Sequence, residues 1–279
     1  MIALRLGAGT AAWVLLMSIS AEQVPAPLER LAARARAAVA YPVAVEQVPD
    51  RGPNLWASFQ PPHPRSILRD PEQNLRVKVS QGYTFFPNAG SFPITVFINL
   101  DRTSTDEIPA ITAHELAHVI LVARGFPFPV LAEPEDRQSQ EILHFVGNLA
   151  LDVAVHATLA REGFRQDASQ RGQLELFINT LERGYESYTS MFTGANSKRV
   201  FVAALACNLL SAVGTASDQR RLFSLLPGDV RSLTETFRRT LSKTPPLTAE
   251  QFQASVRQLT AATGASKPVI EFVRWKPPQ

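Results

Sequence analysis

Two histidines and a glutamate stand together in the segment His114-Glu115-Leu116-Ala117-His118. In a helix, residues four apart lie on one face, one turn apart, so both imidazoles can reach a single zinc ion. The glutamate points to the side of this pair, where its carboxylate can accept a proton from a metal-activated water and later pass it to a leaving amine. The spacing therefore predicts a hydrolytic zinc site with His114 and His118 as ligands and Glu115 as general base.

The flanking residues predict that this segment lies inside a helix. Residues 103–106 are Thr, Ser, Thr and Asp, which are all good N-caps, and Pro109 suits a first helical turn. Apolar positions then run on to Val122, and Gly125 is a typical helix stop.

A small antiparallel sheet is predicted to precede this helix. Leu75–Val79 alternates apolar with polar residues, and Ile94–Leu100 is β-branched and aromatic. The segment Pro87–Ser91 between them is rich in turn residues. Further upstream, apolar spacing predicts a helix from Pro27 to Ala40, and residues 41–64 read as a proline-rich connector.

The segment 114–118 resembles the HExxH signature of the zincin zinc metallopeptidases, which hydrolyse peptide bonds. In zincins an edge strand beside the active-site helix aligns the extended substrate, and the resemblance assigns this role to Ile94–Leu100. The metzincin subgroup continues to a glycine and a third histidine. Because the matching positions here are Leu121 and Arg124, the chain is not expected to be a metzincin, and its subgroup stays unassigned.

A third zinc ligand is expected from the long helical pattern after Pro134. Five polar residues share one stripe of that helix, at spacings of three or four: Glu141, His144, Asn148, Asp152 and His156. Asp152 is preferred, because residues 148–152 resemble the helix that follows HExxH in some bacterial metallopeptidase-like proteins. Glu141 and His144 are the alternatives, since spacing alone does not rank ligand types. His156 is left out of the ligand set, and a solvated helix face is the other interpretation of the stripe.

Composition places the chain among folded globular proteins. It has 279 residues, of which 45% are hydrophobic and 19% charged. The patterns predict an α+β, mainly helical fold in two regions. Residues 22–130 hold the small sheet and the active-site helix, and residues 131–279 form a helical region that supplies the third ligand. Further helices are predicted over residues 174–188, 197–213, 230–241 and 249–262.

Residues 1–21 read as a signal peptide, with Arg5 before an uncharged, mostly apolar run and small residues at its end. We therefore expect a secreted or periplasmic protein with no stable membrane span after cleavage. An uncleaved membrane anchor is the alternative.

Charge and cysteine content narrow the partners. The formal net charge of +3 comes from scattered Lys and Arg, so no nucleic-acid partner is expected. Cys207 is the one cysteine, and its apolar surroundings predict a core residue rather than a disulfide.

Together these features predict an exported zinc metallopeptidase that acts on a peptide or protein substrate, in an oligomeric state that the sequence does not indicate. The first alternative is a zinc-binding or protein-interaction scaffold that retains the HExxH site without turnover. A helical protein without metal is the second.

Overall fold

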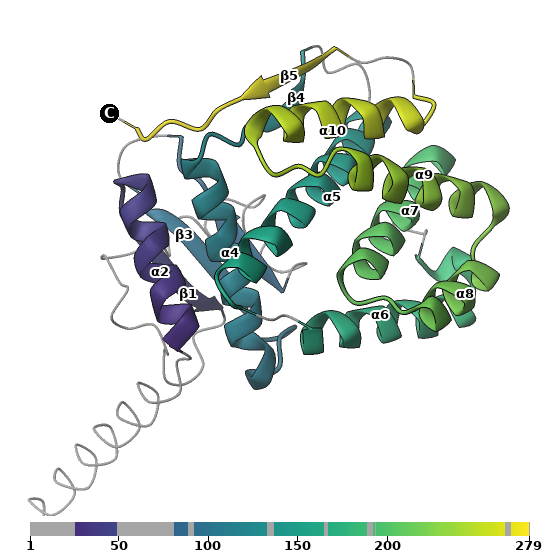
Figure 1. The fold of residues 1–279 in the computed structure, drawn as a ribbon, viewed down its shortest axis with the longest axis horizontal. Helices are drawn as coiled ribbons and strands as arrows, with labels where there is room; N and C mark the ends of the chain where they lie inside the picture. The colour runs from purple at the N-terminus through teal and green to yellow at the C-terminus, as the bar shows by residue number, and fades with distance from the viewer. Residues whose placement is uncertain are drawn as a thin grey trace, which may run out of the picture. The chain divides into compact units, whose positions relative to one another are not determined.

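The computed structural model describes most of the chain from residue 26 onward. The described residues are 26–48, 81–88, 92–132, 137–164, 167–188, 192, 194–265 and 269–278. The predicted signal peptide, residues 1–21, and the predicted strand Leu75–Val79 lie outside them. Over the described residues the fold is α+β and mainly helical, as the sequence predicts, with eight α-helices and two small sheets (Figure 1).

The chain folds as two compact units. The first contains the described residues up to Ile120 together with Glu162–Phe164 and 276–278. The second contains Leu121–Arg161 and Arg165–Trp275, except for the undescribed residues. The sequence patterns predict a division after residue 130, whereas the two compact units divide within helix α4, which spans Ile108–Ala123.

The first unit is built on a three-stranded sheet. Its strands lie in the order β1 (Val43–Val48), β3 (Ile94–Asn99) and β2 (Gly82–Phe85). Strand β1 runs parallel to β3, and β2 runs antiparallel to it. The sheet is therefore mixed rather than wholly antiparallel. The parallel strand β1 lies in the segment that the sequence analysis interprets as a connector.

Strand β3 is the centre of this sheet, and all six of its residues are buried. The prediction that it is an edge strand for a substrate is wrong, because β1 and β2 pair with its two edges. Among the described strands, β2 is an outer strand, and it contacts α4 through a hydrogen bond between Thr84 and Glu115.

Helix α2 (Ala26–Val39) confirms the helix predicted at the start of this unit. Its buried positions recur at helical spacing: Leu28, Leu31, Ala32, Ala35 and Val39. In Figure 1 strands β1 and β3 of this sheet are seen behind α2 and α4. Helix α2 is therefore a second helix of this unit beside α4, which carries the motif, and it buries its apolar stripe.

The second unit is helical apart from one two-stranded ribbon. Its elements in chain order are β4 (Phe128–Leu131), α5 (Arg137–Arg161), α6 (Asp167–Glu182), the 3₁₀ helix η4 (Tyr185–Tyr188), α7 (Ala195–Ala212), α8 (Ala216–Leu225), α9 (Gly228–Lys243), α10 (Ala249–Ala262) and β5 (Ile270–Val273). The long predicted helix and the four that follow it are present. The helix predicted over 174–188 differs most, because α6 begins at Asp167 and ends at Glu182, and residues 185–188 form the separate turn η4. Helix α8 and the antiparallel ribbon β4–β5 are not foreseen by the sequence analysis.

The core of this unit is the packing of α5 against α7 and α10. Small side chains are buried along both α5 and α7, among them Ala150, Ala203 and Ala206, and small residues let helix axes approach closely. Cys207 of α7 is fully buried, as predicted, and burial raises the pKa of its thiol to about 12. The thiol is therefore protonated at neutral pH and serves as an apolar core group.

Helix α5 is also long and apolar enough to cross a membrane, judged by length and composition alone. Among the described helices it is the one that meets this test, and 56% of its most apolar window is buried inside the protein. The core helix of a globular unit meets the same test.

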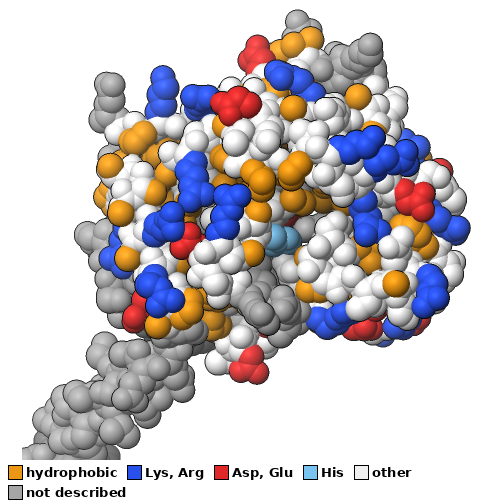
Figure 2. Space-filling view, in the orientation of Figure 1, with side chains coloured by type: hydrophobic (Ala, Val, Ile, Leu, Met, Phe, Trp, Pro, Cys, Tyr) orange, Lys and Arg blue, Asp and Glu red, His pale blue; other side chains and the backbone are white. Residues whose placement is uncertain are grey.

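Charged side chains are dispersed on the face shown in Figure 2. Lys and Arg lie there among acidic, uncharged and hydrophobic side chains, and they do not merge into one basic surface on that face. The expectation that nucleic acid is not a partner stays a prediction.

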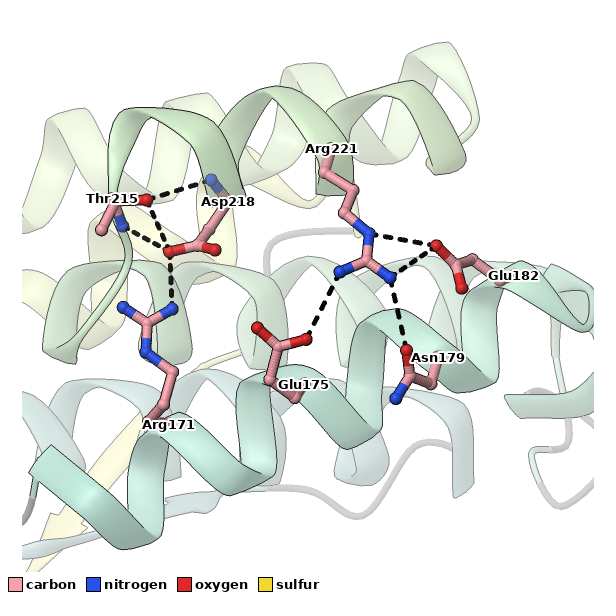
Figure 3. A network of polar contacts seen from close by, with 7 residues as sticks. All are labelled: Arg171, Glu175, Asn179, Glu182, Thr215, Asp218 and Arg221. Carbon is pink, nitrogen blue, oxygen red and sulfur yellow. Dashed lines mark hydrogen bonds and ion pairs between the residues drawn. The ribbon is translucent and has the colours of Figure 1, made fainter.

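A polar network joins α6 to α8 (Figure 3). The guanidinium of Arg221 donates to Glu182 at 2.8 Å and to Glu175 at 3.3 Å. Arg171 donates to Asp218 at 2.6 Å, and Thr215 donates to the same carboxylate through its amide at 2.8 Å and its hydroxyl at 2.7 Å. Asp218 in turn caps α8 together with Thr215. These contacts hold the short helix α8 against α6, and α8 itself buries only Leu222.

The first prediction concerns Asp218, whose pKa is lowered from 3.8 to about 2 by the hydrogen bond from Arg171 and those from Thr215. Because the folded-state pKa lies below the unfolded value, the carboxylate stabilises the fold above about pH 4, and this contribution is lost as the pH falls toward 2. Asp218→Asn should lower the free energy of unfolding by about 1 kcal/mol at pH 7. The difference from wild type should shrink below pH 4 in urea unfolding series.

The exposed Glu235 of α9 supplies the matched control. Glu235→Gln removes the same charge without a cap and should change stability by less than about 0.5 kcal/mol at either pH. A difference between wild type and Asp218→Asn that stays constant from pH 7 to pH 2.5 would contradict the assignment.

Candidate metal centre

Helix α4 has a well-defined start and stop, which set the register of the motif. The 3₁₀ turn η3 (Thr105–Glu107) leads into it, and Ser104 and Glu107 form a capping box. At the other end, the amide of Gly125 donates to Val122 at 2.9 Å, and the amide of Phe126 donates to Leu121 at 3.1 Å. This is the Schellman arrangement, and Gly125 takes the left-handed φ of 84° that it requires. The predicted helix is therefore confirmed.

His114 and His118 lie one turn apart on α4, as their spacing predicts. Their ring centroids are 4.9 Å apart with ring planes at 73°, and both side chains are half-buried. Nitrogen atoms of these two residues and a carboxylate oxygen of Glu115 all lie within 4.8 Å of one another. This donor set fits the ligands that zinc takes in proteins. The three motif residues could therefore contact one cation while the helix keeps its conformation.

Glu115 is the buried member of this group, with 8% of its surface exposed. The hydroxyl of Thr84 donates to Oε2 of Glu115 at 2.7 Å and lies 3.2 Å from its backbone carbonyl. On the neighbouring side, a Cβ atom added to Gly82 would lie only 2.8 Å from Cγ and Oε1 of Glu115. Strand β2 therefore lies directly against this carboxylate.

Thr84 and Gly82 are not among the residues that the sequence motifs predict for the site. Strand β2 is four residues long and lies between the two predicted strands, and no motif marks its residues. The alternation of small and aromatic residues in Gly82-Tyr83-Thr84-Phe85 is the signal that could have indicated a strand with two different faces.

The candidates for a third ligand all lie on α5, in the second unit. Asp152 is half-buried and accepts a hydrogen bond from Nδ2 of Asn208 at 2.8 Å. His144 is exposed, and its ring nitrogen lies 3.0 Å from Asn148. Glu141 accepts from Arg137, one turn away, at 3.2 Å. Because the motif histidines lie in the first unit, the third ligand stays a prediction.

Asp152 is held by a residue of another helix. Its partner Asn208 comes from α7, while Glu141 contacts Arg137 and His144 contacts Asn148, both on α5. The Oδ1 atom of Asn208 is buried and has no hydrogen-bond partner among the described residues. A hydrogen bond from a second helix orients this carboxylate, and Asp152 stays the preferred prediction for the third ligand. His156, which the sequence analysis leaves out, is half-buried and contacts Gln170.

Comparison with known proteins gave no match: no protein-family model, no curated protein and no solved structure is significantly similar to this chain. The function is therefore argued from the site itself.

The second prediction concerns metal binding. His114→Ala and His118→Ala should each weaken zinc binding by about 100-fold or more, because each removes a ligand. Competition with a chromophoric chelator, on the full chain at pH 7.5, measures this loss. His156→Ala is the matched control and should bind zinc as wild type does. Equal zinc affinity in wild type and His118→Ala would contradict the assignment.

The same titration tests the third ligand. Of Asp152→Ala, Glu141→Ala and His144→Ala, we expect the first to cause the largest loss of zinc affinity, about 100-fold. Asn208→Ala should cause a smaller loss of about tenfold, since it removes only the group that orients the carboxylate. A loss confined to Glu141→Ala or to His144→Ala would reassign the ligand to that residue.

Proposed function

We propose that this chain is a zinc-dependent metallopeptidase of the zincin type, outside the metzincin subgroup. The observation that carries the proposal is the cluster of His114, Glu115 and His118 on α4, with donor atoms within 4.8 Å of one another. His114 and His118 would hold the zinc ion, and Asp152 is proposed to complete the ligand set. Zinc bound there would supply a Lewis acid that lowers the pKa of a water molecule and polarises a scissile carbonyl group.

Glu115 is proposed as the general base and acid. Its carboxylate is next to His114 in sequence and within 4.8 Å of the donor atoms of both histidines. At that place a carboxylate can take a proton from the attacking water and deliver it to the nitrogen of the leaving amine. The surrounding protein leaves only 8% of Glu115 exposed, which limits exchange of that proton with bulk water.

Several features support peptide hydrolysis over metal storage. The glutamate follows the first histidine directly, which is the order of the zincin signature, and a storage site has no need of a buried base there. An outer strand, β2, lies against the same helix. The signal-like residues 1–21 lead us to propose that the enzyme is secreted or periplasmic and that its substrate is a peptide or protein in that compartment.

The third prediction separates catalysis from metal binding. Glu115→Gln should lower kcat for peptide cleavage by about 10² to 10⁴, because the amide cannot accept the proton. The same variant should retain its zinc, since the histidines are unchanged. Cleavage of a peptide library is followed by mass spectrometry, and zinc content by elemental analysis. Removal of zinc by chelation should stop cleavage by the wild type, and added zinc should restore it.

Glu107→Gln is the matched control. It makes the same change from carboxylate to amide, but at a residue that caps the start of the helix and is not part of the metal cluster. It should retain wild-type cleavage. Undiminished cleavage by Glu115→Gln would refute the mechanism. Tight zinc binding by a wild type that cleaves no peptide would instead favour the scaffold alternative.

A further inference from the structure

We propose that strand β2 is the positioning element for the base, with Thr84 holding the carboxylate of Glu115 and Gly82 leaving the space that this carboxylate occupies. The catalytic part of this inference rests on the proposed function, whereas the contact between β2 and Glu115 does not. Thr84 is thus a positioning residue, which acts through Glu115.

The hydrogen bond from Thr84 is the first support. Its hydroxyl donates to Oε2 of Glu115 at 2.7 Å, a length typical of a donor bonded to a carboxylate. With 8% of Glu115 exposed, its carboxylate has lost most of its hydration and needs donors from the protein. The hydroxyl meets part of this need and also selects one orientation of the side chain.

The absence of a side chain at Gly82 is the second support. A Cβ atom there would lie 2.8 Å from both Cγ and Oε1 of Glu115, and 2.7 Å from Cγ2 of Ile111. Real Cβ atoms essentially never make contacts this short, so any larger residue would displace the glutamate, Ile111 or the strand. Glycine at this position therefore allows the close approach of β2 to the side chains of α4.

The anchoring of β2 is the third support. Tyr83 and Phe85 pack with the buried Phe97 of β3, and Tyr83 lies directly opposite Phe97 in the antiparallel register. Successive side chains of a strand point to opposite faces, so this aromatic anchor presents Gly82 and Thr84 together to α4. Strand β2 thereby bonds Oε2 of the carboxylate through the Thr84 hydroxyl, and the missing side chain at Gly82 leaves the space beside Oε1.

The consequence is a base with little freedom to rotate. Catalysis by a general base depends on its position within about 1 Å, and a group held by its neighbours loses no orientation during the reaction. Replacement of the donor should therefore slow turnover more than it weakens substrate binding.

The fourth prediction tests Thr84 with a pair of variants on the full-length, zinc-loaded chain. Thr84→Val keeps the shape but removes the donor, and should lower kcat by about 10- to 100-fold with KM and zinc affinity changed less than about twofold. Thr84→Ser restores the hydroxyl and should recover most of kcat. Thr95→Val is the matched control, because Thr95 pairs with Phe85 on the other face and its hydroxyl donates to Pro93 at 3.2 Å. It should leave kcat unchanged.

A second measurement on the zinc-free protein needs no catalysis. Thr84→Val should lower Tm by about 2 to 5 °C in the wild-type background. The shift should be clearly smaller in a Glu115→Ala background, because the bond to Oε2 is already gone and only the 3.2 Å contact with the backbone carbonyl of residue 115 remains. Gly82→Ala should likewise lower Tm in the wild type. It should lower Tm less in Glu115→Ala, where the two contacts with the glutamate side chain are removed and the one with Ile111 remains.

The outcomes separate the two proposals. Additive Tm shifts would overturn the contact between Thr84 and Glu115. Coupled shifts together with an unchanged kcat in Thr84→Val would overturn the positioning role. A wild type without any cleavage would overturn the proposed function, and the Tm shifts would still decide whether β2 holds the carboxylate.

Discussion

The burial of one carboxylate against a sheet is the constraint on which the first unit depends. Helical periodicity places His114 and His118 on one face of α4, and Glu115, one residue further on, must then point to the side. There it meets strand β2, where only 8% of it stays exposed. A buried carboxylate is costly without donors, so β2 has to bring a hydroxyl and also leave room. The composition of a four-residue strand is thus linked to a motif on a different element.

This link explains why the sheet is anchored so firmly. Every residue of β3 is buried, and Phe97 gathers Val48, Tyr83, Phe85 and Phe92 around it. Apolar contacts on one face of β2 fix the position of the strand. On its opposite face, this position brings Thr84 within hydrogen-bond distance of Glu115 on α4. Packing energy from large aromatic side chains therefore sets the geometry of a small polar group.

The helical part of the fold could be predicted from the sequence because its signals are local. Apolar spacing and Pro27 indicate α2, while Ser104, Glu107 and Gly125 act within a turn of the helix that they bound. Strands β1 and β2 could not be predicted in the same way. They are short, and their pairing with β3 depends on residues far away in the chain, which no local pattern records.

The site too has a part that local signals predict and a part that they do not. The spacing of His114, Glu115 and His118 predicts a cluster, and in the structure their donor atoms lie within 4.8 Å of one another. Thr84 carries no motif, and its role emerges only once β2 is paired. On α5, spacing could not rank Asp152 above Glu141 or His144. All three residues lie on the same stripe of the helix, and all three are residue types that bind zinc. The contact of Asp152 with Asn208, a residue of another helix, can be seen only in three dimensions.

The ribbon of β4 and β5 has a consequence for how the second unit is made. Residues 128–131 leave the ribosome long before residues 270–273, which supply their antiparallel partner. Until then β4 has backbone groups that await a distant strand, and such edges attract other chains. Pro129 lies in β4 and cannot donate a backbone hydrogen bond, which makes the waiting strand a poorer template for foreign pairing. Residues 270–273 thus close the ribbon, and the helices between the two strands are synthesised before that closure.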